Sequence, residues 1–264
     1  MQYFEWYMEC NQNLWNQLKE DAENLSKLGI TAVWMPPAYK GVGGKHEVGY
    51  GAYDLYDLGE FDQKETIKTK YGSKDEYLNC IATLKQHGIE SYADIVLNHK
   101  MGADMLQTIP ATKVDWGNHN TQISEQETVR VATKFTFPGR KHKYSDFEWN
   151  WTHFSGIDYN SRTNEIALYK LKNKTWQMDV DKEHGNYDYL MGADIDFNNP
   201  EVVVELKKWG KWYLEITGVD GFRLDAVKHI KSLFMAEWIK EMNQIKPIKC
   251  VGEYWNRDLE VLKW

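Results

Sequence analysis

The spacing of apolar residues changes along this chain, and that change restricts its fold more than any other feature. Four stretches carry apolar residues at the spacing of an amphipathic helix: residues 13–28, 74–87, 203–216 and 230–245. Short apolar runs typical of buried strands lie around them: residues 1–6, 30–35, 89–97, 219–224 and 248–251. Strands that alternate with helices in this way predict an α/β fold with a parallel sheet, built from about five strand–helix units.

The alternation stops between residues 100 and 199, where helical spacing is absent. This stretch is rich in Thr, Trp, Tyr and Asp, and its polar and apolar residues alternate in two short segments, 129–137 and 166–171. A loop of that length without regular structure is implausible inside a compact fold. We therefore predict a small β-rich domain inserted after the third strand.

Charge and composition narrow the range of partners. The net charge of −7 disfavours nucleic acid and anionic membranes, because both require a basic surface. The 12 Trp and 16 Tyr outnumber the 9 Phe, and such amphipathic rings suit sugar surfaces, although most are expected in the core. No apolar run is long enough to span a bilayer, and the N-terminus lacks the pattern of a signal peptide.

Three cysteines, Cys10, Cys80 and Cys250, lie far apart and without the spacing of a metal site. An odd number of isolated cysteines indicates reduced thiols rather than a disulfide framework. We therefore expect a cytoplasmic protein. The alternative is a secreted protein whose N-terminal signal is removed or missing.

The most informative segment is residues 221–230, Gly-Phe-Arg-Leu-Asp-Ala-Val-Lys-His-Ile. Arg223 and Asp225 lie two positions apart at the end of an apolar run, so a strand would direct both side chains to one face. Glu253 follows at the end of the next predicted strand. Two carboxylates at the C-terminal ends of successive parallel strands could form a catalytic pair.

We expect the two carboxyl groups to differ in protonation. The Arg223 guanidinium would lower the pKa of Asp225 and keep it ionised as a nucleophile. Glu253, beside Trp255 and with less positive charge nearby, would stay protonated as an acid. The simpler interpretation is a structural ion pair between Arg223 and Asp225, which is the more common role of an isolated Arg-x-Asp sequence.

Several segments of the chain resemble the α-amylase family of glycoside hydrolases, in particular the bacterial liquefying α-amylases, including their cytoplasmic subgroup. They are Met-Gln-Tyr-Phe-Glu-Trp at 1–6, Trp-Met-Pro-Pro-Ala-Tyr-Lys-Gly at 34–41, Gly-Tyr-Gly-Ala-Tyr-Asp-Leu at 49–55, Asp-Ile-Val-Leu-Asn-His at 94–99, the segment 221–229, and Glu-Tyr-Trp at 253–255. The resemblance implies a (β/α)8 TIM barrel with a β-rich domain after its third strand.

On this resemblance, residues 1–99 begin the catalytic barrel, 100–196 form the inserted domain, and 197–264 continue the barrel. The family's third carboxylate, an Asp in an Asn-His-Asp sequence, does not occur up to Trp264. We therefore expect the chain to be the N-terminal portion of a longer enzyme. We also expect residues 1–264 to be inactive by themselves, because about five units cannot close an eight-stranded barrel.

The resemblance also assigns roles to individual residues. Asp225 would be the nucleophile, and Glu253 the general acid and base. The residues implied to hold sugars are Trp6, Tyr50, His99, Arg223, Lys228, His229 and Trp255, with Trp6 and Trp255 as stacking platforms.

A calcium ion is the implied cofactor. Its ligands on this resemblance are Asn98, Asp188, Asp194 and the backbone carbonyl of His229. Such an oxygen-rich set suits Ca²⁺, although Asp188 and Asp194 could instead be turn and cap residues. Some liquefying amylases hold further cations through two additional carboxylates, whereas Ser155 and Gln177 stand at those positions here, so we do not expect a second site.

The expected activity is that of an α-amylase: endo-hydrolysis of α-1,4-glucosidic bonds in starch, glycogen and maltodextrins with retention of configuration. The expected partner is an α-glucan polysaccharide or maltooligosaccharide bound by a monomer, with no nucleic acid and no membrane. One alternative is a related α-glucosidase or α-glucan transferase with the same carboxylates. Another is a noncatalytic glucan-binding protein, which would not require Arg223, Asp225 and Glu253 together.

Overall fold

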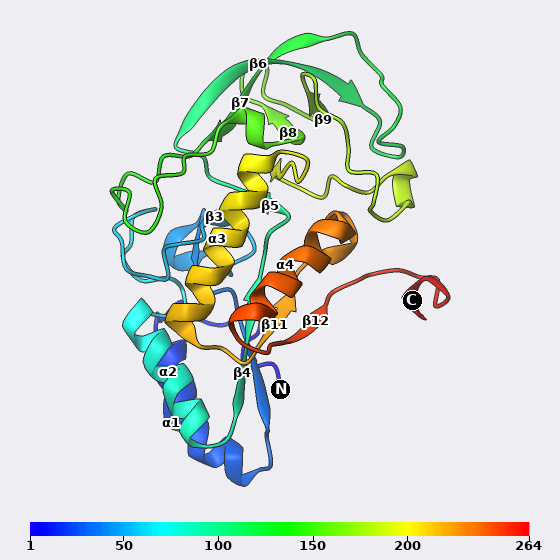
Figure 1. Ribbon diagram of the computed structural model, residues 1–264. Coiled ribbons are helices and arrows are strands. Elements are labelled where there is room, and N and C mark those ends of the chain that lie inside the picture. The colour runs from blue at the N-terminus through cyan, green and yellow to red at the C-terminus, as the bar shows by residue number, and fades with distance from the viewer. Residues whose placement is uncertain (264) are drawn as a thin grey trace.

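A parallel β-sheet forms the centre of the protein, of which a computed structural model describes residues 1–263 (Figure 1). The order of its strands, each parallel to the next, is β1 (Ala32–Met35), β4 (Glu90–Ile95), β11 (Gly221–Leu224) and β12 (Lys249–Gly252). The helices that alternate with them are α1 (Leu14–Lys27), α2 (Lys74–Gln86), α3 (Pro200–Thr217) and α4 (Ser232–Ile245). Helix α1 packs beside α2, and α3 beside α4. This arrangement confirms the predicted α/β fold with a parallel sheet.

The strand predicted for residues 1–6 is wrong. Only Gln2 pairs with the sheet, through one parallel bridge to Trp34 on β1. The chain then turns away, because Met8 N donates a hydrogen bond to Glu5 O (3.5 Å) and Tyr7 N donates to the Glu5 carboxylate (2.6 Å). The parallel sheet therefore contains four strands and this bridge instead of the predicted five strands.

Local signals determine where the helices begin. Ser73 caps α2 by accepting a hydrogen bond from Glu76 N (3.3 Å), and the Glu76 carboxylate accepts one from Ser73 N (2.7 Å), which is a capping box. Asn199 accepts a hydrogen bond from Glu201 N (2.9 Å) and leaves Pro200 in the first turn, where a missing N–H has no cost. Helix α3 therefore begins at Pro200, ahead of the stretch 203–216 in which apolar residues have helical spacing.

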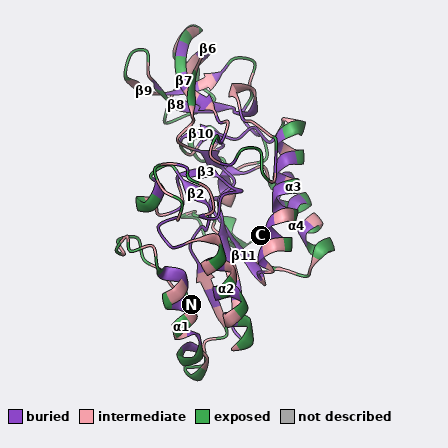
Figure 2. Cartoon of the chain, turned by 90° about the vertical axis from the view of Figure 1, so that its left-hand side faces the viewer, coloured by how far each residue is buried: buried purple, intermediate pink, exposed green. Residues whose placement is uncertain are grey.

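Tryptophan side chains fill the space between the sheet and helices α3 and α4. The rings of Trp209 and Trp238 are buried and stack with 6.4 Å between their centroids. Trp209 Nε1 donates to Leu55 O (2.8 Å) and Trp238 Nε1 to Leu206 O (3.0 Å), so both polar N–H groups are satisfied in the core. Figure 2 shows this buried interior, with the exposed residues on the outer faces of the helices.

A second sheet lies beyond the C-terminal ends of the parallel strands, at the top of Figure 1. Its order, antiparallel throughout, is β7 (Glu127–Lys134), β6 (Met105–Val114), β9 (Glu165–Leu171) and β8 (Gly156–Asn160). Strands β7 and β9 coincide with the two alternating segments of the sequence, whereas β6 and β8 are not predicted. Strand β10 (Ala193–Asp194) pairs antiparallel with β5 (His99–Lys100), which brings the end of this stretch back to its start.

The remaining elements are short. Strands β2 (Lys40–Gly41) and β3 (Ala52–Asp54) form an antiparallel pair. Turns of 3₁₀-helix lie at Gly44–His46, Trp151–His153, Glu183–Gly185, Val227–His229 and Val261–Lys263. Trp264, the last residue of the predicted third part of the chain, lies outside the described residues. Within residues 1–263 we find no helix both long and apolar enough to cross a membrane.

Candidate active site

Arg223 lies at the centre of the site and contacts three carboxylates. Its Nη1 donates to Asp94 Oδ1 (2.8 Å) and to Asp225 Oδ1 (2.6 Å), and its Nη2 lies 2.6 Å from Glu253 Oε1. Strand register explains the meeting, because Arg223 pairs with Asp94 across β11 and β4, and β12 follows on the other side of β11. The predicted pair, Asp225 and Glu253, therefore meets on one guanidinium.

Asp94 was not assigned a role from the sequence, although it lies near the C-terminal end of β4. Its carboxylate is fully buried, and it accepts hydrogen bonds from Trp34 Nε1 (3.0 Å) and Tyr50 Oη (2.9 Å) besides Arg223. Tyr50 is thereby held at the edge of the site. The signal in the sequence is that Asp94 opens the segment 94–99, one of those that resemble the α-amylase family.

The backbone turns sharply after Asp225. Ala226 has φ 52° and ψ 35°. This left-handed conformation is unusual for alanine, and such strained residues cluster at functional sites. This turn lets Ala226 N donate to Glu253 Oε2 (3.2 Å), while Asp225 N donates to Ile95 O (2.9 Å). The strained turn thus links the ends of β4, β11 and β12.

The protonation of Asp225 differs from the prediction. Burial and then the negative charge of Asp94 raise the pKa of Asp225 to about 7, although the Arg223 guanidinium opposes them. Arg223 does lower this pKa, as predicted, but burial of the carboxylate outweighs the ion pair, so the prediction of a low pKa for Asp225 is wrong.

Glu253 also differs from the prediction. Burial raises its pKa, but a hydrogen bond from Trp255 Nε1 (2.8 Å), the charge of Arg223 and the N–H of Ala226 outweigh burial, so the pKa is lowered. The sequence places Trp255 near Glu253 but does not show that its indole acts as a donor, nor that Arg223 reaches this carboxylate as well.

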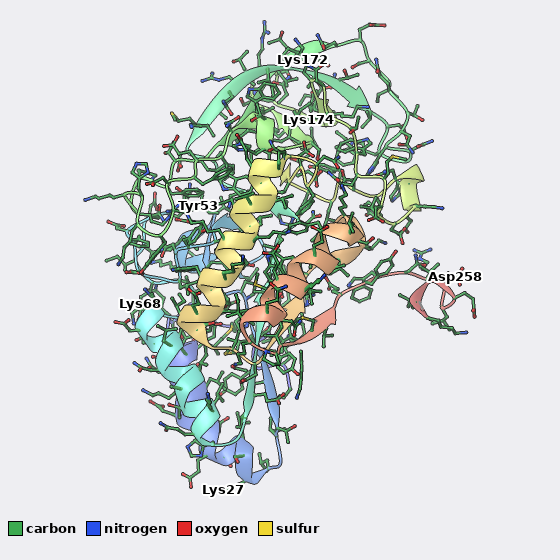
Figure 3. All side chains as sticks on the ribbon, in the orientation of Figure 1. Lys27, Tyr53, Lys68, Lys172, Lys174 and Asp258 are labelled. Atoms are coloured by element: carbon green, nitrogen blue, oxygen red, sulfur yellow. The ribbon has the colours of Figure 1, made fainter. Side chains whose placement is uncertain are left out.

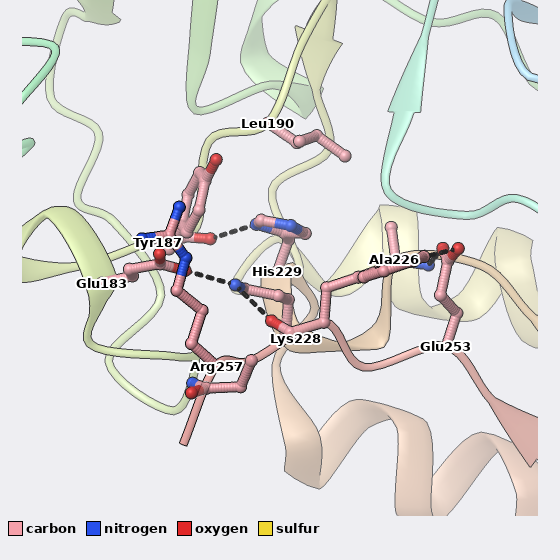
Figure 4. Close-up of a pocket in the computed structure, with 10 residues that line it drawn as sticks. Glu183, Tyr187, Leu190, Ala226, Lys228, His229, Glu253 and Arg257 are labelled. Carbon is pink, nitrogen blue, oxygen red and sulfur yellow. Dashed lines mark hydrogen bonds and ion pairs between the residues drawn. The ribbon is translucent and has the colours of Figure 1, made fainter. Parts of the chain in front are cut away.

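Two cavities meet at Glu253 and Ala226. The first has a volume of about 390 Å³, and the predicted site residues that line it are Trp6, Tyr50, His99, Arg223, Asp225 and Glu253. The second has a volume of about 640 Å³, and those lining it are Lys228, His229, Glu253 and Trp255 (Figure 4). The structure thus brings every residue predicted to hold sugars to one of two cavities beside the carboxylates.

The aromatic rings of the first cavity are arranged as a platform. Trp6 stacks on Tyr50 with 5.7 Å between centroids and an interplanar angle of 6°. Trp6 is 56% exposed, and Trp255 in the second cavity is 74% exposed. Exposed indole faces beside polar groups suit the faces of sugar rings.

Three further predicted sugar-binding side chains are, like Tyr50, Arg223 and Trp255, hydrogen-bonded within the protein. His99 Nε2 contacts Tyr50 O (2.8 Å), and burial lowers the pKa of His99. His229 Nδ1 contacts Tyr187 O (2.7 Å), and burial lowers the pKa of His229 to about 4. Lys228 Nζ donates to Trp255 O (2.7 Å) and to a carboxylate on the opposite wall (Figure 4). The lowered pKa values favour the neutral form of both histidines, which shape the walls of the cavities.

Residues 15–249 match the protein family described as alpha amylase, catalytic domain. The chain belongs to the α-amylase family. The family match confirms the predicted fold class, a (β/α)8 TIM barrel that is incomplete here, of which β1, β4, β11 and β12 are strands.

Curated relatives and solved structures agree with this family. The chain is 50% identical to an alpha-amylase of Geobacillus stearothermophilus, over 99% of this chain and 48% of the relative. It is 45% identical to the cytoplasmic alpha-amylase of Escherichia coli strain K12, over 100% of this chain and 54% of the relative. The chain therefore spans about half the length of these relatives. The solved alpha-amylase of Geobacillus thermoleovorans, complexed with acarbose, aligns with a TM-score of 0.57 at 20% identity, over 96% of this chain and 44% of that chain.

Three of the residues that resemble the family's calcium ligands, Asn98, Asp188 and Asp194, lie close together where β10 pairs with β5. Asp194 pairs with His99 in the β10–β5 ladder, and Ile195 N donates to Asn98 O (3.0 Å). Asn98 Oδ1 is buried and has no hydrogen-bond partner among residues 1–263. Burial raises the pKa of Asp188 to about 8, and burial and then the nearby charge of Asp188 raise that of Asp194.

These groups fit an oxygen-binding cation. An unpaired amide oxygen and two buried carboxylates are costly without a partner, and they are the ligand types that Ca²⁺ takes. Across residues 1–263, no three His, Cys, Asp or Glu side chains form a metal cluster. The proposed set differs from such a cluster because it combines two carboxylates with an amide and a carbonyl.

Asp196, two residues after Asp194, is bonded to a lysine and to a neutral amide side chain. Lys174 Nζ lies 2.7 Å from Asp196 Oδ2, and Gln177 Nε2 donates to Asp196 Oδ1 (3.2 Å). Ser155 donates to the Asp194 carboxylate. Lys174 lies near the N-terminal end of α3 (Figure 3). Asp196 is therefore already paired with a cationic side chain.

Proposed function

We propose that the protein hydrolyses internal α-1,4-glucosidic bonds of α-glucans such as starch, glycogen and maltodextrins with retention of configuration. The observation that carries the proposal is the position of Asp225 and Glu253, which share Arg223 where two cavities meet. A cavity on each side of the carboxylates leaves room for sugar units on both sides of the bond, as an endo-acting hydrolase requires. Relatives named alpha-amylase and, in Bacillus sp. strain 707, glucan 1,4-alpha-maltohexaosidase support this substrate class.

The proposed reaction has two steps. Asp225 attacks the anomeric carbon while Glu253 protonates the oxygen of the leaving sugar, which gives a glycosyl ester on Asp225. Glu253 then removes a proton from water, and the water oxygen attacks the same carbon and releases Asp225. Two inversions at one carbon give net retention.

The reaction needs its proton on Glu253, whereas burial in the free protein favours a proton on Asp225. The two groups interact through Arg223, so they titrate as a pair rather than independently. A sugar bound against the half-buried Glu253 excludes water from it, which disfavours its charged form. We propose that substrate binding thereby transfers the shared proton from Asp225 to Glu253 and leaves the nucleophile ionised.

Calcium is the proposed cofactor. Asn98 Oδ1, the carboxylates of Asp188 and Asp194, and the carbonyl of His229 would hold it, since they supply oxygen ligands on both sides of the inserted stretch. When bound, the ion supplies the positive charge that the two buried carboxylates otherwise lack. The three free thiols and the relative named cytoplasmic support a cytoplasmic location, which cell fractionation tests.

We propose the domain boundaries 1–99, 100–196 and 197–264, with the barrel in the first and last parts. The β10–β5 pair near residue 196 supports the second boundary, because there the chain returns to the end of β4. Limited proteolysis tests the boundaries, with cleavage expected in loops of 100–196 before the parallel sheet is attacked.

Two substitutions test the catalytic pair in the full-length protein. Asp225→Asn should lower kcat on a maltooligosaccharide by about three orders of magnitude or more, because the nucleophile is lost. Glu253→Gln should lower kcat/KM on the maltooligosaccharide but spare kcat/KM on α-maltosyl fluoride, because kcat/KM reports the first step and fluoride departs without a proton.

Asp220→Asn is the matched control. Asp220 lies at the opposite end of β11 and is paired with Lys246 (3.0 Å), far from the cavities in the strand direction. Hydrolysis by Asp225→Asn at the rate of the Asp220→Asn control would overturn the proposed function. Product analysis by anomeric NMR then separates hydrolysis from transfer to a second sugar.

A further inference from the structure

Asp181 is a buried carboxylate that contacts the segment carrying Glu253. It lies in the loop between β9 and β10 and is 8% exposed. Its Oδ2 accepts hydrogen bonds from Tyr254 Oη (2.6 Å) and Asn256 Nδ2 (3.0 Å), and its Oδ1 accepts one from Glu183 N (2.8 Å). One oxygen therefore holds two side chains of the segment that follows β12.

Side chains of that segment alternate between two directions. Tyr254 and Asn256 reach Asp181, whereas Trp255 Nε1 donates to Glu253 Oε1 (2.8 Å) on the cavity side. Because successive side chains of an extended chain point to opposite sides, holding Tyr254 and Asn256 on one side fixes the direction of Glu253 and Trp255 on the other.

The loop of Asp181 is also bonded to the turn that follows Asp225. Asp181 N donates to Lys228 O (2.9 Å), and Lys228 Nζ donates to Glu183 Oε2 (2.5 Å) and Trp255 O (2.7 Å). Figure 4 shows Lys228 between Glu183 and the segment of Glu253. The positions of the two catalytic carboxylates relative to one another thus depend on contacts that converge on this loop.

The charge of Asp181 strengthens these contacts. Burial by itself raises its pKa, but hydrogen bonds from Tyr254, from Glu183 N and from Asn256 outweigh burial, so the pKa is lowered. The carboxylate is ionised, and hydrogen bonds to an ionised acceptor are shorter and stronger than neutral ones. Asparagine at this position keeps the shape but loses the charge.

We propose that Asp181 is a positioning residue for the general acid: it holds Tyr254 and Asn256 so that the Glu253 carboxyl faces the glycosidic oxygen. This inference rests on the proposed function of Glu253. A misplaced acid slows the first step when the leaving group needs a proton, and has little effect on that step when the leaving group departs without one. A structural role would lower both rates equally.

The test compares two substrates in the full-length protein: a maltooligosaccharide, whose leaving sugar needs a proton, and α-maltosyl fluoride. For Asp181→Asn we expect kcat/KM on the maltooligosaccharide, which reports the first step, to fall about ten- to a hundredfold, with kcat/KM on the fluoride nearly unchanged. Asp179→Asn is the matched control, because Asp179 lies in the same loop but its carboxylate accepts from Leu233 N (2.9 Å) on α4. The control should leave both rates at their native values.

Each outcome decides between the possibilities. Tyr254→Phe removes one donor without a charge and should give a smaller loss of the same kind, which keeps the idea testable if Asp181→Asn does not fold. Equal losses on both substrates, or rates equal to those of Asp179→Asn, would overturn the positioning role. If the native protein cleaves neither substrate, the proposed function fails, and the role of Asp181 falls with it.

Discussion

Replacing Arg223 by glutamine should destabilise the protein, because one guanidinium neutralises three carboxylates. Arg223 lies within 2.6 to 2.8 Å of oxygens of Asp94, Asp225 and Glu253. Asp94 is fully buried, and Asp225 is 7% exposed. Removing one partner of a buried ion pair typically costs about 3–5 kcal/mol, because the charge that remains has no compensation. The rise in the pKa of Asp225 from 3.8 to about 7 already corresponds to a cost of about 4 kcal/mol for its ionised form with Arg223 in place.

The loss should depend on pH with a definite sign. Asp225 has a folded-state pKa above its unfolded value, so its contribution to stability is present below the unfolded pKa and is lost as the pH rises through about 7. Without the Arg223 cation, the pKa values of the carboxylates around it should rise further. The free energy of unfolding of Arg223→Gln should therefore fall by about 3–5 kcal/mol at pH 8 and by less at pH 5, where protons replace the lost cation.

Urea denaturation of the full-length protein at the two pH values measures this difference. Lys249→Gln is the control, because Lys249 on the adjacent strand β12 pairs with Glu90 (2.6 Å) at an exposed position. That pair should contribute little, since water screens it. The reasoning fails if Arg223→Gln is as stable as the native protein at pH 8, or if its loss is no smaller at pH 5.

Two further predictions concern the cation and the helix packing. Calcium should stabilise the protein by about 1.4 kcal/mol for each tenfold excess over its dissociation constant, and Asp194→Asn should abolish this effect in thermal melts. Calorimetric titration should find one ion per chain, and two tightly bound ions would contradict the role of Lys174 beside Asp196. Gly210→Ala should destabilise the protein, because the added Cβ would lie 2.7 Å from Trp238, and overpacking of about 1–3 kcal/mol exceeds the gain of about 1 kcal/mol in helix propensity; an increase in the urea midpoint would refute it.

Short-range patterns are sufficient for the helices of this chain but not for all of its strands. Helices α1 and α2 match the predicted ranges 13–28 and 74–87 closely, because periodic apolar residues end at Gly29 and Gly88. Strand β6 is not predicted, since Pro110 lies at its centre opposite Thr128, and proline rarely occurs inside a strand.

The residues of the candidate site also differ in whether the local sequence predicts their place. The motif around residues 221–230 places Asp225 correctly on the face of Arg223. Asp94 faces Arg223 only through the register of β4 and β11, and Asp181 reaches Tyr254 across a long stretch of sequence. Neither relation is visible in local spacing. The pKa of Asp225 is raised and that of Glu253 lowered, opposite to the predictions. Local spacing does not reveal this either, because burial and the number of contacts made by one guanidinium depend on the whole fold.

The inserted stretch connects the proposed cation to the cavities without contact between ion and sugar. Tyr187 O accepts from His229, whose ring lies edge-on to Tyr187 with 4.3 Å between centroids. Asp188 follows Tyr187 directly, so an ion held by Asp188 restrains the backbone that supports His229. Loss of the ion would release this wall of the second cavity, which Lys228 also lines. The effect of calcium on turnover should therefore be greatest for glucans long enough to fill that cavity.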